Sequence, residues 1–274
     1  MANKHIVIPP MLHGGSACQA CHANLRQLGI DVTDWDYVVA LAGNPNTGKS
    51  TVFNALTGLK QHVGNWPGKT VARAEGGFEL GGKRYKLVDL PGTYSLLSAS
   101  VDEEIARDFI LFGKPDCTIV VVDATVLERN LNLVLQVLEI TDRVVVCLNL
   151  MDEAKRKGIQ VDHHRLSSDL GVSVVPTVAR TGEGLSHLMR AVSDTIEGHF
   201  KTHPHRINTG GPLQKAVEEL IPLIEGVFPG LPNARWIALR LLDGDMRLRR
   251  ALESGELALL TDASSQPSHA ASCH

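Results

Sequence analysis

The feature that most constrains this chain is an eight-residue segment, Gly43-Asn44-Pro45-Asn46-Thr47-Gly48-Lys49-Ser50. It fits the pattern G-x-x-x-x-G-K-[S/T] and lies between a β-branched run at Tyr37–Ala42 and a helical pattern at Lys49–Leu56. At such a junction, glycine-rich backbone can turn several N–H groups toward one anion, and the helix dipole adds positive potential. The segment therefore predicts a phosphate-binding loop in which Lys49 contacts phosphate oxygens and Ser50 binds Mg²⁺.

Short β-branched runs alternate with helix-length segments from Asp36 to about His199. This alternation is typical of a mostly parallel sheet with helices on both faces. The expected strands are Tyr37–Ala42, Gly77–Leu80, Tyr85–Asp89, Thr118–Asp123, Val144–Asn149 and Val172–Pro176. The expected helices are Lys49–Leu56, Asp102–Phe112, Leu131–Glu139, Asp162–Leu170 and Gly184–Ile196. Gly81-Gly82 predicts that Gly77–Asp89 forms an antiparallel hairpin at one edge of the sheet.

The strand pattern stops after His199, and helical spacing of apolar residues follows. Helices are expected at Pro212–Gly226, Asn233–Leu242 and Arg247–Leu260. We therefore expect four parts: residues 1–34, an N-terminal extension with a Cys/His cluster; residues 35–200, an α/β domain; residues 201–262, a small all-helical domain; and residues 263–274, a tail or linker.

Composition excludes some classes of function. The net charge of −3 and the 4% aromatic content disfavour a nucleic-acid-binding surface. No apolar run reaches the roughly 18 residues that would span a bilayer, and the N-terminus has no apolar signal core behind a basic start. Five cysteines, two of them in expected core strands, suit a reducing cytoplasm better than a disulfide framework.

Two further motifs follow expected strands: Asp89-Leu90-Pro91-Gly92 and Asn149-Leu150-Met151-Asp152. Asp89 can hold Mg²⁺ through water while the Gly92 N–H faces the terminal phosphate. The Asp152 carboxylate can accept both hydrogens that guanine presents on N1 and its exocyclic amine, a pair of donors that adenine lacks. Asn149 would brace the base and the phosphate loop. The motifs therefore predict that the chain binds and hydrolyses GTP.

The segment Val63–Val71 is rich in glycine and proline and contains Thr70. We expect a mobile switch loop in which Thr70 completes the magnesium shell when γ-phosphate is bound. A surface loop with an incidental threonine is the alternative. Trp66 in this segment either caps the nucleotide pocket or packs the loop.

Together these motifs resemble the G domain of the ferrous iron transport protein B (FeoB) family over about residues 37–260. The resemblance rests on residues 43–50, 63–71, 89–96, 123–131, 149–152 and 180–184. It implies a Ras-like P-loop GTPase fold. The implied nucleotide-binding residues are Gly43, Asn44, Pro45, Asn46, Thr47, Gly48, Lys49, Ser50, Thr51, Gly68, Lys69, Thr70, Asp89, Gly92, Asn149, Met151, Asp152, Val178, Ala179 and Arg180.

The resemblance also implies a setting for the chain. The helical stretch looks like the family's small domain that slows nucleotide release, and in the family a polytopic membrane domain for Fe²⁺ transport follows. We therefore expect this chain at the cytoplasmic face of the inner (cell) membrane, with small FeoA- or FeoC-type accessory proteins as partners. Assembly into a homo-oligomer stays open.

The chain departs from common GTPase patterns at three positions. Val178 replaces a serine and Leu150 a lysine near the base, so we expect faster nucleotide exchange. Thr93 occupies the position where Ras-like enzymes orient water with a glutamine. The resemblance implies that K⁺ supplies the missing charge, held by Asn46 and by carbonyls near Gly64–Trp66. We expect slow, K⁺-stimulated hydrolysis with Lys49, Thr70, Gly92 and Asn46 as the catalytic residues.

A cluster at Cys18, Cys21 and His22 lies outside the region of resemblance. These ligand types suit a transition-metal site for Zn²⁺ or Fe²⁺. Cys-x-x-Cys-His also fits covalent haem attachment, a redox-sensing dithiol, or a solvated extension with no bound partner. The sequence leaves these readings open.

Three functions fit the whole chain. The first is a GTPase switch that gates an attached iron-transport membrane domain. The second is an RNA- or ribosome-associated GTPase, against which the net acidity argues. The third is a nucleotide-binding assembly domain with negligible turnover, which the missing glutamine favours.

Overall fold

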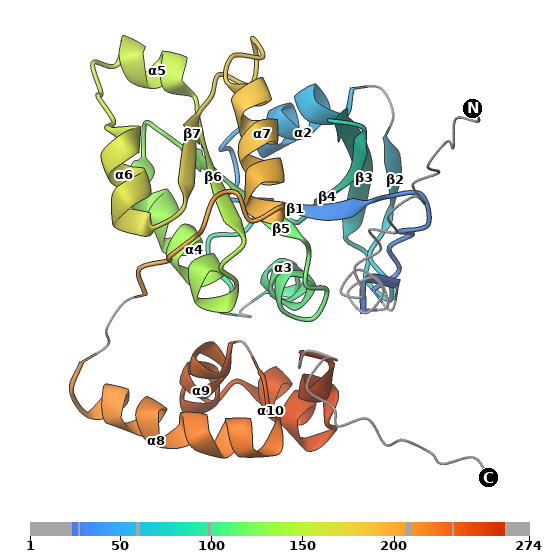
Figure 1. Cartoon of the computed structure of the whole chain (residues 1–274), viewed down its shortest axis with the longest axis vertical. Helices are drawn as coiled ribbons and strands as arrows, with labels where there is room; N and C mark the ends of the chain where they lie inside the picture. Colours follow the sequence, from blue (N-terminus) through green and yellow to red (C-terminus); the bar gives the residue numbers. More distant parts are fainter. Residues whose placement is uncertain are drawn as a thin grey trace, which may run out of the picture.

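The computed structural model describes residues 24–26, 28–58, 61–97, 100–206, 210–231 and 233–260. A seven-stranded sheet carries helices on both faces, and a separate group of helices lies beside it (Figure 1). That group consists of α8 (Gly211–Val227), α9 (Ala234–Leu242) and α10 (Met246–Glu253). The α/β fold with a small helical domain is confirmed.

The strands lie in the order β2-β3-β4-β1-β5-β6-β7; β3 pairs antiparallel with β2 and β4, and the remaining neighbours pair parallel. The predicted hairpin is β3–β4, whose two connecting glycines have φ of 58° and 75°, as a two-residue turn between twisted strands requires. The strand bounds are Tyr37–Gly43 for β1, His62–Asn65 for β2, Ala72–Leu80 for β3, Lys83–Asp89 for β4, Cys117–Asp123 for β5, Val144–Asn149 for β6 and Ser173–Pro176 for β7.

Side chains of the central strand β1 alternate between two cores, because successive strand residues point to opposite faces. Val38 and Ala40 pack with the core beneath α3 and α4, whereas Val39 and Leu41 pack with the core beneath α2 and α7. The helix bounds are Lys49–Thr57 for α2, Val101–Leu111 for α3, Leu127–Ile140 for α4, Met151–Arg156 for α5, His163–Leu170 for α6 and Leu185–Ile196 for α7.

Several local structures differ from the predictions: the short helix α5 was not expected, and α4 begins at Leu127 instead of Leu131. Residues His62–Asn65, expected within a loop, form the edge strand β2, and β3 begins at Ala72 instead of Gly77. The exposed strand β2 has no regular alternation of apolar residues, and Arg73 and Glu75 interrupt that alternation in β3, although the backbones of the two strands pair normally. The expected helix Arg247–Leu260 ends at Glu253, because Gly255 adopts φ 76° and a short 3₁₀ turn follows.

The helical domain contacts α3 and α4 through polar side chains. Buried Arg107 of α3 donates to Asp245, 3.0 Å away, and Arg235 of α9 pairs with Glu139 of α4 at 3.3 Å. Arg247 of α10 pairs with Asp108 of α3 at 3.4 Å. The two domains are therefore joined by ion pairs as well as by apolar packing.

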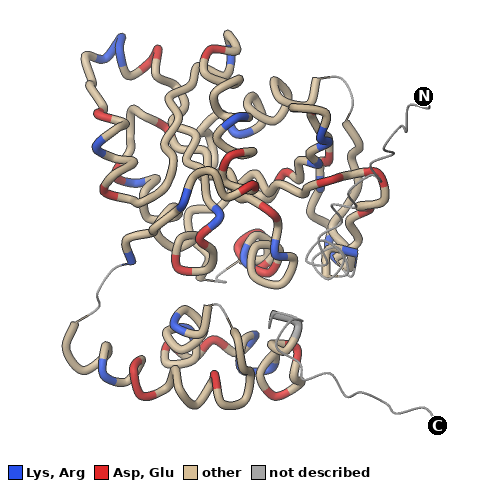
Figure 2. Tube along the Cα trace, viewed as in Figure 1, with Lys and Arg blue, Asp and Glu red and all other residues tan. Residues whose placement is uncertain are grey.

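Acidic and basic positions are intermixed along the described chain (Figure 2). No helix among the described residues is long and apolar enough to cross a membrane.

Candidate nucleotide-binding site

The phosphate loop leaves β1 at the centre of the sheet, where the neighbouring strands β4 and β5 lie on opposite sides. In open α/β sheets this reversal of strand order opens a crevice at the carboxyl ends of the strands. The loop leads into α2, whose N-cap Gly48 has φ 82° and provides no side-chain cap. The first N–H groups of α2 are thus not capped by a side chain, which leaves the helix N-terminus suited to an anion.

At two positions of the loop, neighbouring atoms lie so close that only glycine fits. A Cβ on Gly43 would lie 2.8 Å from the Val121 carbonyl oxygen, and one on Gly48 would lie 2.4 Å from Asn149 Nδ2. Thr47 Oγ1 donates to the Asn44 carbonyl at 2.9 Å and closes the loop. The backbone of the predicted phosphate loop is therefore held from both sides.

Lys49 and Asp89 meet at this loop, with Lys49 Nζ 2.5 Å from Asp89 Oδ1. Burial raises the pKa of the Asp89 carboxyl, and the charge of Lys49 opposes that rise. The segment after Asp89 is tied to β1, because the Leu90 N–H donates to Leu41 and the Thr93 N–H to Gly43. Gly92 faces Pro45, whose nearest atoms would be 3.6 Å from an added Cβ. The two predicted phosphate and magnesium motifs are brought together.

Asn149 joins the phosphate loop to the predicted base-binding loop. Its Nδ2 donates to the Thr47 carbonyl at 3.0 Å, and its Oδ1 accepts from the Ala179 N–H at 3.0 Å. The residue is 1% exposed, so its amide is committed to these bonds. Thr177 adds a third contact, with Oγ1 3.3 Å from the same oxygen. Thr177 was not among the predicted site residues, although it stands directly between the expected strand Val172–Pro176 and Val178.

Asp152 lies near the start of α5 with its side chain 30% exposed, and Arg180 Nη2 approaches its Oδ2 at 3.4 Å. The Met151 N–H donates to the Thr177 carbonyl, and Val178 is buried with its N–H on Glu183. Leu150 and Asn46 adopt left-handed backbone with φ of 62° and 67°. Asparagine tolerates this conformation, whereas it is unfavourable for leucine, and such strained residues cluster at functional sites.

Among the described residues, no recorded hydrogen bond or ion pair joins the predicted switch segment, residues 63–71, to these groups. Thr70 is exposed, and among the described residues the structure records no hydrogen bond for its side chain. Trp66 is 5% exposed and packs edge-on against Phe109 of α3, so it packs the loop. Lys69 pairs with Glu104 of α3 at 3.0 Å. The roles predicted for Gly68, Lys69 and Thr70 stay predictions.

The residues present fit a magnesium ion beside a phosphate. The Asp89 carboxylate and the exposed Ser50 hydroxyl are the hard oxygen donors that Mg²⁺ prefers. The amide of Asn44, 3% exposed, has no hydrogen-bond partner for either polar atom within the described residues. Leaving a buried amide without hydrogen bonds costs about 1–3 kcal/mol of folding free energy. The Asn44 amide is therefore an unpaired polar group of the loop, two residues from Asn46.

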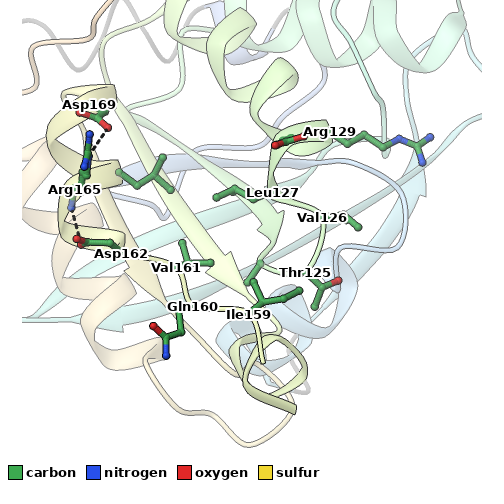
Figure 3. Close-up of a pocket in the computed structure, with 13 residues that line it drawn as sticks. Thr125, Val126, Leu127, Arg129, Ile159, Gln160, Val161, Asp162, Arg165 and Asp169 are labelled. Atoms are coloured by element: carbon green, nitrogen blue, oxygen red, sulfur yellow. Dashed lines mark hydrogen bonds and ion pairs between the residues drawn. The ribbon is translucent and has the colours of Figure 1, made fainter. Parts of the chain in front are cut away.

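The Cys18, Cys21 and His22 cluster lies outside the described residues, and the described residues contain no group of three metal-ligating side chains. A separate hollow of about 700 Å³ lies between the start of α4 and α6 (Figure 3). Val126, Leu127, Ile159 and Val161 lie along it, and no residue of the predicted nucleotide site does.

Comparison with known proteins gives two adjoining family matches. Residues 37–192 match the family described as ferrous iron transport protein B, and residues 210–270 match the family described as FeoB cytosolic helical domain. A fused Fe²⁺ transport protein A/Fe²⁺ transporter FeoB from Porphyromonas gingivalis is 44% identical over 77% of this chain and 26% of its own length. The FeoB Fe²⁺ transporter of Salmonella typhimurium is 41% identical over 82% of this chain and 29% of its own length. The chain thus spans less than a third of these relatives.

Solved structures give the same result. The cytosolic domain of the T. maritima FeoB iron transporter in apo form matches with 39% identity and a TM-score of 0.73, covering 83% of this chain and 88% of that one. The same domain in a GDP form has a TM-score of 0.72, covering 83% of this chain and 87% of that one, with 39% identity.

Proposed function

The chain belongs to the ferrous iron transport protein B (FeoB) family, and on this premise we propose that it is the GTP-binding and GTP-hydrolysing switch of a ferrous iron transporter. One observation carries the proposal most directly: Asn149 bonds to the phosphate loop and to the base-binding loop at once. Such a link orients the phosphate and guanine ends of one nucleotide relative to each other. The GDP form of the T. maritima relative supports the same ligand.

The residues of the site suit phosphoryl transfer to water. The Lys49 ammonium would leave Asp89 to stabilise negative charge on the phosphate oxygens, while Asp89 and Ser50 hold Mg²⁺, which neutralises the phosphates when bound. The Thr93 hydroxyl donates to the Ser95 carbonyl at 2.6 Å, so it holds its own segment. We therefore assign positioning of the attacking water to backbone groups of the switch.

Potassium is the proposed source of further positive charge near the phosphates. The Asn46 amide oxygen is a hard donor, and the residue is exposed on the loop, so it fits a monovalent cation. Slow turnover follows from the absence of a glutamine at Thr93. We expect GTP turnover in KCl to exceed that in NaCl severalfold, and equal rates would refute this part.

The helical domain is proposed to slow nucleotide release, because Arg240 of α9 reaches the segment that follows Asp89. Its Nη2 donates to the Leu97 carbonyl at 3.1 Å. Movement of residues 89–97 would therefore strain contacts in the helical domain. By family membership we also propose a polytopic membrane domain in the same polypeptide, a place at the cytoplasmic face of the membrane, and FeoA- or FeoC-type partners.

Phosphate release from GTP tests the function. Lys49→Ala should reduce the rate by about 100-fold or more, the usual loss when one preorganised electrostatic contact is removed. Asp89→Ala should also abolish Mg²⁺-dependent turnover. Lys215→Ala changes an exposed lysine on α8 and is the matched control. Turnover that survives in Lys49→Ala would contradict the proposal, and binding of GTP with no turnover in the unmodified chain would favour an assembly role.

A further inference from the structure

Residues 24–26 and 28–34 precede both regions that match the FeoB family, yet they are packed onto the G domain. Leu25, Ile30 and Val32 are 0–2% exposed and belong to the core that includes Trp66 and Phe109. Figure 1 shows this dark blue segment at the β2 edge of the sheet. The described part of the N-terminal extension is therefore a structural element and not a solvated extension.

The segment ends a helical turn with a Schellman motif. The Ile30 N–H donates to the Leu25 carbonyl at 3.0 Å, and the Gly29 N–H donates to the Arg26 carbonyl at 2.9 Å. Gly29 has φ 75°, the left-handed conformation that this motif requires. After this turn, the carbonyl groups of Leu28 and Gly29 point toward β3.

Arg73 of β3 binds those carbonyls and the switch loop together. Its Nη1 donates to Leu28 at 3.2 Å and its Nη2 to Gly29 at 3.0 Å, while its guanidinium lies 5.4 Å from the centre of the Trp66 ring. Glu75 pairs with Arg73 Nε at 2.8 Å and fixes its orientation. A planar guanidinium can make all these contacts at once, which an ammonium cannot.

Gly29 also touches the switch loop directly. A Cβ on Gly29 would lie 2.8 Å from Pro67 Cγ, so the backbone of the segment rests on that proline. The loop closes on itself, because the Trp66 N–H donates to the Val71 carbonyl at 3.0 Å. Thr70 thus lies in a closed turn that Gly29 and Arg73 hold from one side and α3 holds from the other.

We propose that residues 24–34 brace the loop of residues 63–71, with Gly29 and Arg73 as positioning residues for GTP hydrolysis. The inference rests on the proposed function, because it assigns Thr70 to the loop that completes the reacting site. The brace touches neither the phosphate loop nor the base-binding loop. It therefore acts on the rate of the chemical step and not on nucleotide affinity.

The test uses the full chain with Gly29→Ala and Arg73→Lys. Arg73→Lys keeps the charge beside Glu75 but loses the fork that reaches two carbonyls. Gly255→Ala is the matched control, because Gly255 has φ 76° and an added Cβ there would meet nothing within 4 Å. It introduces the same backbone strain without a contact to the switch loop.

Three quantities are measured: kcat and KM for GTP, the affinity for a fluorescent GDP analogue, and the ¹⁹F spectrum of protein that contains 5-fluorotryptophan. The three tryptophans give three resonances, with Trp236 in the helical domain as an internal reference. Both brace variants should lower kcat fivefold or more, leave KM and GDP affinity within twofold, and shift the Trp66 resonance alone.

The outcomes separate the brace from the proposed function. If the unmodified chain does not hydrolyse GTP, both the proposed function and the proposed brace are refuted. If GTP is hydrolysed and Lys49→Ala stops the reaction, an unchanged kcat in the brace variants overturns the brace alone. An unmoved Trp66 resonance, or parallel losses in kcat and GDP affinity, overturns it as well, because either shows that the loop was not the element affected.

Discussion

The buried ion pair between Arg107 and Asp245 should dominate the stability of the helical domain. Arg107 is fully buried, the Asp245 side chain is 3% exposed, and their atoms lie 3.0 Å apart. Asp245 Oδ2 also lies 3.3 Å from Arg240 Nη2. Asp245→Asn keeps the shape of the side chain, including Oδ1, which accepts from two N–H groups at the start of α10. It removes the charge that compensates two arginines and replaces Oδ2, which accepts from both of them, with an NH₂ group that can only donate.

The magnitude follows from what remains around Arg107. Removing one partner of a buried pair costs about 3–5 kcal/mol. Asp108 still lies 2.9 Å from Arg107, so the lower end applies and we expect a loss of about 3 kcal/mol. In a helical domain this small, 1 kcal/mol shifts the midpoint of thermal unfolding by about 4–8 °C, so we expect the midpoint to fall by about 12–24 °C. Urea unfolding followed by circular dichroism measures the change.

The control is Arg249→Ala, which removes a pair with Glu253 on the same helix. Those side chains are 66% and 60% exposed, so the loss should be about 0.5 kcal/mol or less. Arg107→Met combined with Asp245→Asn should cost less than the sum of the single changes, because no unpaired charge stays buried. A loss below about 1 kcal/mol for Asp245→Asn would refute the argument that this pair joins the domains.

Three further predictions concern the nucleotide and the cysteines. Asp152→Asn should weaken GTP binding and strengthen XTP binding, since the amide offers a donor where xanthine carries a carbonyl; competition against a fluorescent GDP analogue measures both. Burial raises the pKa of the Cys147 thiol to about 12 and also raises that of Cys117, so neither should react with iodoacetamide at pH 8 until urea unfolds the chain, as peptide mapping would show. We also propose a transition metal at Cys18, Cys21 and His22, whose content should fall in Cys18→Ser; equal metal in both proteins would reject the site.

The sequence alone was sufficient for the motifs in which neighbouring residues act together. The phosphate loop requires glycine at Gly48 because of its φ of 82°, and Gly81-Gly82 requires a tight hairpin. These backbone conformations depend on neighbouring residues only, so the sequence predicts them. The continuous apolar run of β1 likewise predicted a strand covered on both faces. β2 escaped prediction because an exposed edge strand carries no such pattern.

Tertiary structure alone decided which distant side chains meet. Asn149 reaches Ala179 across 30 residues, Arg73 reaches Leu28 across 45, and Arg107 reaches Asp245 across 138. No spacing rule connects such residues, because their distance depends on how the strands are ordered and how the helices pack. The burial of Arg107 was not predictable either, because its position in the sequence is typical of a surface charge on an amphipathic helix. Arg107 is buried because the helical domain packs over α3. A charge removed from water needs an opposite charge beside it, so the stability of the fold depends on its partner Asp245.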